Sequence, residues 1–137
     1  MKKILIIEDE YYLGSTYQNS LVEAGYEAKW VKTINEAKKI ASKFSADLLL
    51  LDHGFQSETA NGIESIPEFK KRFPSSIIII FSNYSDFNLK QLAFQKGAHD
   101  YWLKIGTSLE DLIRKVNLCL LSHNTNNTIM KKRSILN

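Results

Sequence analysis

The sequence is poor in the residues that cross-link or interrupt a small protein. It has one cysteine, Cys119, so it can form neither an internal disulfide nor a cysteine-based metal site, and a reducing compartment is expected. Two prolines and six glycines among 137 residues exclude a collagen-like chain, and 44% hydrophobic with 24% charged residues is typical of a globular one. This length is that of one ordinary domain, so we expect a single core.

Long hydrophobic runs are also missing. The longest are 4–7, 48–51 and 77–81, far shorter than the roughly 20 residues of a transmembrane helix. The basic amino terminus is followed by only four apolar residues before the acidic triplet 8–10, which is unlike a signal peptide. We therefore expect a cytoplasmic protein.

Acidic residues are absent from the end of the chain. Residues 122–137 hold three of the 18 basic residues, at 131–133, so residues 1–121 hold 15 of each sign and the formal net charge of +3 comes from the tail. The polar, asparagine-rich stretch 123–128 adds to this contrast. The sequence therefore predicts a folded domain over 1–121 and a basic, disordered tail or the start of a linker over 122–137.

Short apolar runs alternate with segments of helical periodicity, a pattern typical of buried parallel strands separated by helices. The expected strands are 3–7, 27–31, 47–51, 77–81 and 100–103. Right-handed crossovers between them predict a doubly wound α/β fold. We expect a (βα)5 three-layer sandwich around a parallel five-stranded sheet in the flavodoxin-like order 2-1-3-4-5.

Capping signals mark several helix ends. Thr33 and Thr107, each followed by glutamate three residues later, are expected to open the second and fifth helices. Pro67 lies within the apolar series of the third helix and would interrupt a helix interior. We therefore expect that helix to begin late, with Ser65 as its cap and Pro67 in its first turn, and to end at Pro74.

Polar side chains follow four of the expected strands. Glu8 and Asp9 come after the first, Asp52 after the third, Ser82 after the fourth and Lys104 after the fifth. Because the carboxyl ends of parallel strands meet at one edge of the sheet, these side chains should converge in one crevice. Several carboxylates so close together repel one another unless a cation lies among them, and a hard divalent ion such as Mg²⁺ suits oxygen ligands.

This arrangement resembles the response-regulator receiver domain of two-component signalling, the CheY-like family, over residues 2 to 121. The family has an acidic pair after its first strand, a phospho-accepting aspartate after its third, a hydroxyl residue after its fourth and a lysine after its fifth. Residues 97–104 also resemble the fifth-strand motif of that family. The sequence is thus identified as a receiver domain by several motifs in the right order.

The resemblance implies a phosphorelay role. Asp52 would take a phosphoryl group from the phosphohistidine of a sensor histidine kinase or a histidine phosphotransfer protein. Lys104 and Ser82 would bind its oxygens, and Tyr101 would turn as Ser82 moves. This switch would act on an output partner, or a second copy, through the face of the fourth helix, fifth strand and fifth helix. The resemblance implies no enzymatic activity other than self-phosphorylation and autodephosphorylation.

The cofactor that the resemblance implies is Mg²⁺. Asp9, Asp52 and the backbone carbonyl of Gly54 would hold the ion directly, and Glu8 would reach it through water. No membrane contact is implied, and nucleic acid would be a partner only through a further domain. The chain would then be the amino-terminal part of a longer regulator.

The sequence departs from the family pattern at three points. The loop from His53 to Gly62 is longer than usual, Asn83 replaces a small residue after the fourth strand, and Ile105 replaces the usual proline after the lysine. These departures leave open a receiver-like interaction module that is not phosphorylated. A Mg²⁺-dependent phosphohydrolase is a second alternative, although such enzymes commonly carry an acid where this chain has Gly54.

Overall fold

A computed structural model describes residues 1–54 and 61–136 of the chain, with side chains described through residue 123. Strands and helices alternate from the amino terminus onward. In order they are β1 (Lys3–Ile7), α1 (Tyr11–Glu23), β2 (Glu27–Val31), α2 (Ile34–Ile40), β3 (Leu48–Leu51), α3 (Gly62–Arg72), β4 (Ile77–Ser82), α4 (Phe87–Lys96), β5 (Asp100–Leu103) and α5 (Leu109–Leu136). Each expected strand is present, with bounds that differ by no more than one residue.

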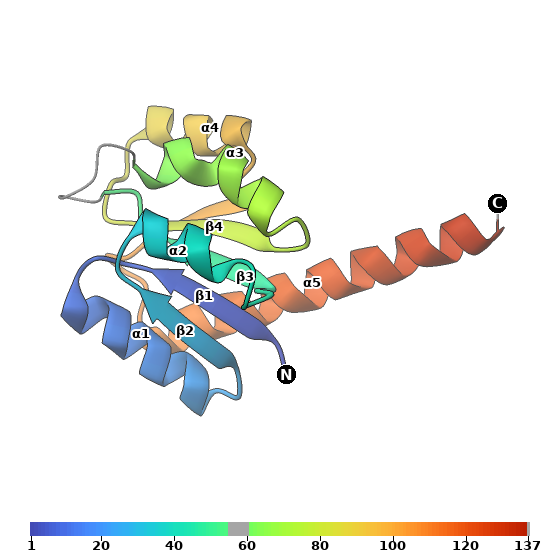
Figure 1. Cartoon of the computed structure of the whole chain (residues 1–137), viewed down its shortest axis with the longest axis horizontal. Coiled ribbons are helices and arrows are strands. Elements are labelled where there is room, and N and C mark those ends of the chain that lie inside the picture. The colour runs from blue at the N-terminus through green and yellow to red at the C-terminus, as the bar shows by residue number, and fades with distance from the viewer. Residues whose placement is uncertain (55–60, 137) are drawn as a thin grey trace.

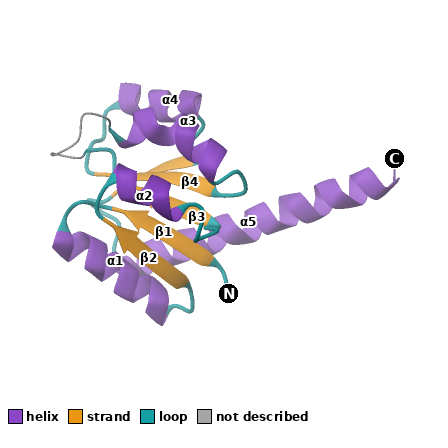
Figure 2. Cartoon of the chain, in the orientation of Figure 1, coloured by secondary structure: helices purple, strands orange, loops and turns teal. Residues whose placement is uncertain are grey.

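The sheet is parallel throughout and has the order β2-β1-β3-β4-β5. Figure 2 shows the helices packed around the central strands. Side chains of α2, α3 and α4 share one buried cluster with the sheet, and those of α1 and α5 share a second. The doubly wound, three-layer α/β fold predicted from the sequence is therefore confirmed.

The inner strands β1, β3 and β4 are largely apolar on both faces because helices cover both faces. In β1, Leu5 and Ile7 join one buried cluster while Ile4 and Ile6 join the other. Every residue of β3 and of β4 is buried. Burying one such side chain stabilises the fold by roughly 1.5–3 kcal/mol, which fixes the register of the strands and hence of the residues that follow them.

Two of the expected caps differ in outcome. The Thr33 hydroxyl accepts a hydrogen bond of 3.0 Å from the backbone N–H of Glu36, so the cap of α2 is confirmed. The cap expected at Thr107 is wrong by one residue, because Ser108 accepts from the N–H of Asp111 at 3.0 Å. The Thr107 hydroxyl instead donates to a carbonyl at the end of β5.

The expected start of α3 is also wrong. The helix begins at Gly62, with Asn61 as the cap that accepts from the Glu64 N–H at 2.9 Å, so Pro67 lies inside the helix rather than in its first turn. The Ser65 hydroxyl donates to the Asn61 carbonyl instead of capping. Asn61 caps the helix although an interior proline is unfavourable, and the buried apolar face of α3 compensates for that cost. The end of α3 at Arg72, ahead of Pro74, agrees with the prediction.

The last helix, α5, includes most of the carboxyl-terminal segment. The structure continues α5 to Leu136, and Figure 1 shows this helix extending well beyond the body of the domain. No glycine or proline follows Gly106 in the sequence, so nothing there interrupts the helix. The division of the chain at residue 121 stays a prediction. None of the described helices has the length and apolar character of a membrane span.

Candidate functional site

A cavity of about 680 Å³ opens at the carboxyl edge of the sheet. It lies where β1, β3, β4 and β5 end, which is where the sequence places its polar residues. The residues that line it are Glu8, Asp9, Glu10, Tyr11, Leu13, Asp52, Gly54, Asn83, Tyr84 and Lys104. The structure therefore brings five of the expected site residues, Glu8, Asp9, Asp52, Gly54 and Lys104, into one pocket.

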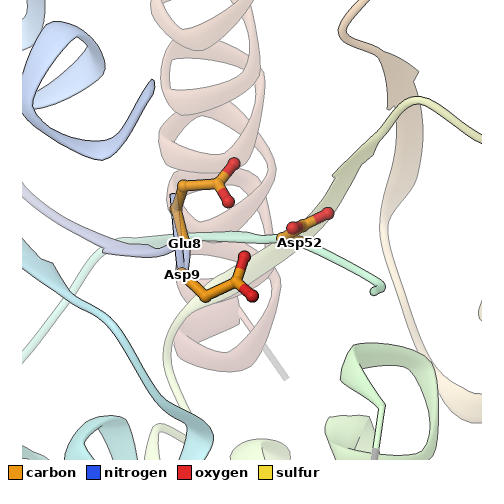
Figure 3. A group of neighbouring side chains, drawn as sticks. All are labelled: Glu8, Asp9 and Asp52. Atoms are coloured by element: carbon orange, nitrogen blue, oxygen red, sulfur yellow. The ribbon is translucent and has the colours of Figure 1, made fainter. Parts of the chain in front are cut away.

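Three carboxyl groups form the acidic part of this pocket. Figure 3 shows Glu8 and Asp9, at the end of β1, beside Asp52 at the end of β3. One oxygen from each lies within 4.8 Å of the others. Glu8 and Asp52 are buried and Asp9 is half-buried, so solvent screens their mutual repulsion only in part.

Backbone hydrogen bonds extend the sheet and hold these residues in place. The N–H of Asp52 donates to the Ile7 carbonyl at 3.0 Å, and the N–H of Glu8 donates to the Val31 carbonyl at 3.1 Å. The Glu8 carboxylate also accepts from the N–H of Glu10 at 3.2 Å. The acidic residues are thus fixed by the register of three neighbouring strands.

Lys104 brings a positive charge into the acidic pocket. Its ammonium group donates a short hydrogen bond to Glu8 and lies 3.3 Å from a carboxylate oxygen of Asp52. Burial raises the pKa of Glu8 to about 7, against the hydrogen bond from Lys104 and with a further rise from the charge of Asp52. Lys104 thus offsets part of the negative charge of Glu8 and Asp52, and a cation among the three carboxylates would offset more.

The donor set of the pocket fits a hard divalent cation. Carboxylate oxygens are ligands that Mg²⁺ accepts in proteins, and Mg²⁺ usually keeps several bound waters, for which the cavity leaves space. Gly54 lines the cavity and has no side chain to fill it. A Cβ at this position would lie 3.2 Å from the ring of Tyr84. The geometry is compatible with Mg²⁺ and with a larger anionic group beside it.

Ser82 and Tyr101 meet at the loop that follows β4. Ser82 is fully buried, and its hydroxyl accepts from the N–H of Tyr84 at 3.1 Å. The Tyr101 hydroxyl donates to the carbonyl of Tyr84 at 2.6 Å. Burial raises the pKa of Tyr101, while a hydrogen bond with the Ser82 side chain opposes the rise. Both side chains therefore hold the same loop, although Asn83 and Tyr84, rather than Ser82, line the described pocket.

Sequence reasoning missed two residues that shape the pocket. Tyr84 is exposed over 56% of its surface and lies against Gly54. In the sequence, the one feature that could have indicated its role is that it is an aromatic residue in the loop after β4. Gly62 packs so closely that a Cβ would lie 2.0 Å from the Asp52 carbonyl oxygen. Its N–H donates to the His53 carbonyl at 2.9 Å. The interior of this loop, 55–60, lies outside the described residues, so the expected change in its shape stays a prediction.

Known proteins share both the sequence pattern and the fold. An NtrX-like response regulator of Rickettsia felis is 28% identical over 98 residues, which make up 72% of this chain and 21% of that protein. The chain thus spans about a fifth of the length of the first curated relatives it matches.

Solved structures share the fold at lower sequence identity. A CheY-like receiver domain protein from Methanospirillum hungatei JF-1 has a TM-score of 0.82 at 22% identity, covering 92% of this chain and 98% of that chain. NtrX from Brucella abortus has a TM-score of 0.87 at 21% identity, covering 96% of this chain and 30% of that chain.

The family follows from the sequence comparison rather than from the fold. The family model of the response regulator receiver domain matches residues 4–117, which is most of the chain and includes every site residue described above. Its span begins in β1 and ends within the part of α5 that packs on the sheet. The chain belongs to the response regulator receiver domain family.

Proposed function

We propose that Asp52 is the phosphoacceptor of this receiver domain. The observation that carries the proposal is the convergence of Asp52, Lys104 and the acidic pair of β1 in one pocket. A carboxylate oxygen of Asp52 attacks the phosphorus of a phosphohistidine, the phosphorus–nitrogen bond breaks, and the imidazole leaves with the bonding electrons. The product is an acyl phosphate on Asp52, which water later hydrolyses.

The other pocket residues would bind the charge that this step brings in. Lys104 would exchange its contact with Asp52 for one with a phosphoryl oxygen. Asp9, Asp52 and the Gly54 carbonyl would hold Mg²⁺, with Glu8 acting through water. When bound, Mg²⁺ supplies positive charge to the phosphoryl oxygens and to the crowded carboxylates.

The partners of the reaction follow from its chemistry. The donor is a sensor histidine kinase or a histidine phosphotransfer protein, and we place this exchange in the cytoplasm. The domain is a signalling module with no separate substrate to turn over. Its own chemistry is limited to self-phosphorylation and autodephosphorylation.

The output would depend on Ser82 and Tyr101. A phosphoryl group on Asp52 offers oxygens to the Ser82 hydroxyl, which now accepts from the N–H of Tyr84. Movement of Ser82 would disturb the loop to which Tyr101 is bonded and so bias the face of α4, β5 and α5. That face exposes Phe94, Leu103 and Leu118, which an output partner or a second copy would cover.

One observation favours the alternative of an interaction module that works without phosphorylation. Ser82 is fully buried and its hydroxyl already has a partner, so the described pocket is lined without it. The phosphohydrolase alternative has no such support, because Gly54 occupies the position of the second acid.

Binding of beryllofluoride, a mimic of the phosphoryl group, separates phosphoacceptor from interaction module. We expect a ¹⁹F NMR signal of bound beryllofluoride in the presence of Mg²⁺ and its loss in the Asp52→Asn variant. Absence of a bound signal in the folded wild-type protein at saturating Mg²⁺ would leave the interaction module as the better description.

A further inference from the structure

A tryptophan in β2 reaches the acidic loop from outside the pocket. The indole Nε1–H of Trp30 donates a hydrogen bond of 2.8 Å to the backbone carbonyl of Glu8. The N–H of Glu8 donates to the carbonyl of Val31, the next residue of β2. Both backbone polar groups of Glu8 are therefore held by β2, one by the main chain and one by a side chain.

The bonded carbonyl belongs to the peptide unit that joins Glu8 to Asp9. Because a peptide unit is planar, its orientation constrains the directions in which both residues project their side chains. In the same loop, the N–H of Glu10 donates to the Glu8 carboxylate at 3.2 Å, so the main chain next to this peptide unit is also tied to Glu8. The Trp30 bond thus acts on the peptide that sets the spacing of the acidic pair from Asp52.

The indole has a close-fitting site on α1. A Cβ at Gly14 would lie 2.1 Å from two ring atoms of Trp30, so only glycine admits the ring there. Glycine weakens a helix interior relative to alanine, yet Gly14 lies buried inside α1. The contact with Trp30 gives the physical reason for a glycine at this position.

The outer side of the indole is also covered. The ring of Tyr11 meets it edge to face with centroids 5.4 Å apart. The ammonium group of Lys32 lies 5.6 Å from the centroid of the Trp30 ring and 5.3 Å from that of Tyr11. The ring is thus fixed from several sides, and its N–H has a defined direction.

We propose that Trp30 is a positioning residue for the divalent cation site. By holding the Glu8–Asp9 peptide, it keeps the two β1 carboxylates at the spacing from Asp52 at which they share a cation. This inference rests on the proposed function of the acidic cluster as a cation site. Removal of groups that orient metal ligands commonly weakens metal binding by about 10- to 100-fold. For loss of the Trp30 bond we expect cation affinity to fall about 10-fold, near the lower end of that range, because the carboxylates themselves remain.

The test compares two tryptophan variants of the full chain. Trp30→Phe keeps an aromatic ring and removes the donor to Glu8. Trp102→Phe is the matched control, since Trp102 is also a tryptophan of the sheet whose Nε1–H has a partner, the carboxylate of Asp100 at 3.0 Å. Binding of Mn²⁺, followed by the loss of the free-ion EPR signal, should weaken about 10-fold in Trp30→Phe and by less than about twofold in Trp102→Phe. Melting temperatures, measured without metal, show whether each variant is folded.

A second measurement needs no substitution at the site. In the ¹H–¹⁵N NMR spectrum of the wild-type protein, the indole resonance of Trp30 should shift during a Mg²⁺ titration with the midpoint of cation binding, while that of Trp102 stays in place. If Trp30→Phe does not fold, this titration tests whether Trp30 is coupled to the cation site.

The outcomes separate this inference from the proposed function. Wild-type affinity in folded Trp30→Phe, or an unmoved Trp30 resonance at saturating Mg²⁺, would overturn the positioning role and leave the cation site standing. A wild-type protein that binds neither Mn²⁺ nor Mg²⁺ would overturn both.

Discussion

Lys104 and Glu8 show how single residues set the charge of the pocket. Their side chains are almost completely buried and bonded to each other, with Asp52 as the second acid beside the lysine. A buried ion pair of this kind is a weak source of stability, because both charges lose their hydration. The pair instead fixes the Lys104 ammonium group between Glu8 and Asp52, where the proposed function needs a positive charge.

The raised pKa of Glu8 predicts a pH dependence of stability without metal. The folded protein holds the Glu8 proton up to about pH 7, whereas the unfolded chain releases it near 4.5. The stabilisation is therefore complete below about pH 4.5 and is lost as the pH rises through 7. We expect Glu8→Gln to remove this loss, worth on the order of 1–2 kcal/mol after solvent screening.

The measurement is thermal unfolding of wild type and Glu8→Gln in EDTA between pH 5 and 8. The variant should be the more stable protein at pH 8 and should gain less from added Mg²⁺. If the melting temperatures of the two proteins change in parallel with pH, the raised pKa of Glu8 is not the cause of the pH dependence.

Gly62 predicts a second effect at the residue scale. A methyl group there would lie 2.0 Å from the Asp52 carbonyl oxygen, so backbone must move. We expect Gly62→Ala to lower the free energy of unfolding by about 1–3 kcal/mol and to slow phosphorylation of Asp52. The exposed neighbour Glu64, substituted by alanine, serves as a control and should cost well under that. Urea unfolding and labelling with acetyl phosphate measure both, and unchanged values in Gly62→Ala would show that the contact is not tight.

Among the elements, α3 differs most from the sequence analysis at its start, whereas the cap of α5 differs by one residue. Asn61 caps the helix and Pro67 lies inside it, where its missing N–H leaves the Ile63 carbonyl without its usual helical partner. The helix accepts this because its apolar face is buried, including Ile63, Ile66 and Phe69. Tertiary packing thus overrides the local signal of the proline.

This position predicts that Pro67→Ala stabilises the protein. A proline inside a helix is disfavoured by about 3 kcal/mol relative to alanine, and part of that is offset by the stiffer unfolded chain, so we expect a gain of about 1–2 kcal/mol. Pro74→Ala, beyond the helix end, is the matched control and should be neutral or slightly destabilising. Chemical unfolding of both variants measures the difference. A loss of stability in Pro67→Ala would instead favour a proline in the first turn.

Much of the fold and site could be predicted because the signals are repeated along the chain. Short apolar runs such as 77–81, separated by segments of helical periodicity, indicate buried strands, and parallel strands bring Asp52 and Lys104 to the same edge of the sheet. The missed features depend on contacts between distant residues. Gly62, at the start of α3, packs against the Asp52 carbonyl, and Tyr84 packs against Gly54. Neither contact leaves a periodic pattern in the sequence.

At the scale of the described domain, the acidic pocket and the exposed apolar residues of α4, β5 and α5 belong to one fold. The described helix α5 packs on the sheet through Leu112, Val116 and Leu120 and then continues to Leu136, away from the body (Figure 1). The same helix exposes Leu118 and Leu121, and Leu118 lies beside the residues of β5. Ser82 and Tyr101, the residues of the proposed switch, are both bonded to Tyr84 in the loop after β4.

The proposed switch predicts different effects of two substitutions on the output. Ser82→Ala should keep beryllofluoride binding measurable but weaken its effect on self-association or partner affinity, and Tyr101→Ala should alter that effect without removing the pocket. Coupling between two sites commonly amounts to about 1–3 kcal/mol, or roughly 5- to 150-fold in affinity. Sedimentation velocity with and without beryllofluoride measures it. If beryllofluoride changes the sedimentation of the wild type and of both variants equally, the proposed switch is wrong. The loop after Asp52 would then be the better candidate for the moving part.

The most direct test of the account is the intact mass of the protein after incubation with acetyl phosphate. With Mg²⁺ present, the wild-type chain should gain the mass of one phosphoryl group, and this gain should be absent in EDTA and in the Asp52→Asn variant. Asp47→Asn is the matched control, since Asp47 precedes β3 at the opposite edge of the sheet and should leave labelling unchanged. Labelling of Asp52→Asn at the wild-type rate, or labelling that is indifferent to EDTA, would contradict the assignment of Asp52 as the phosphoacceptor.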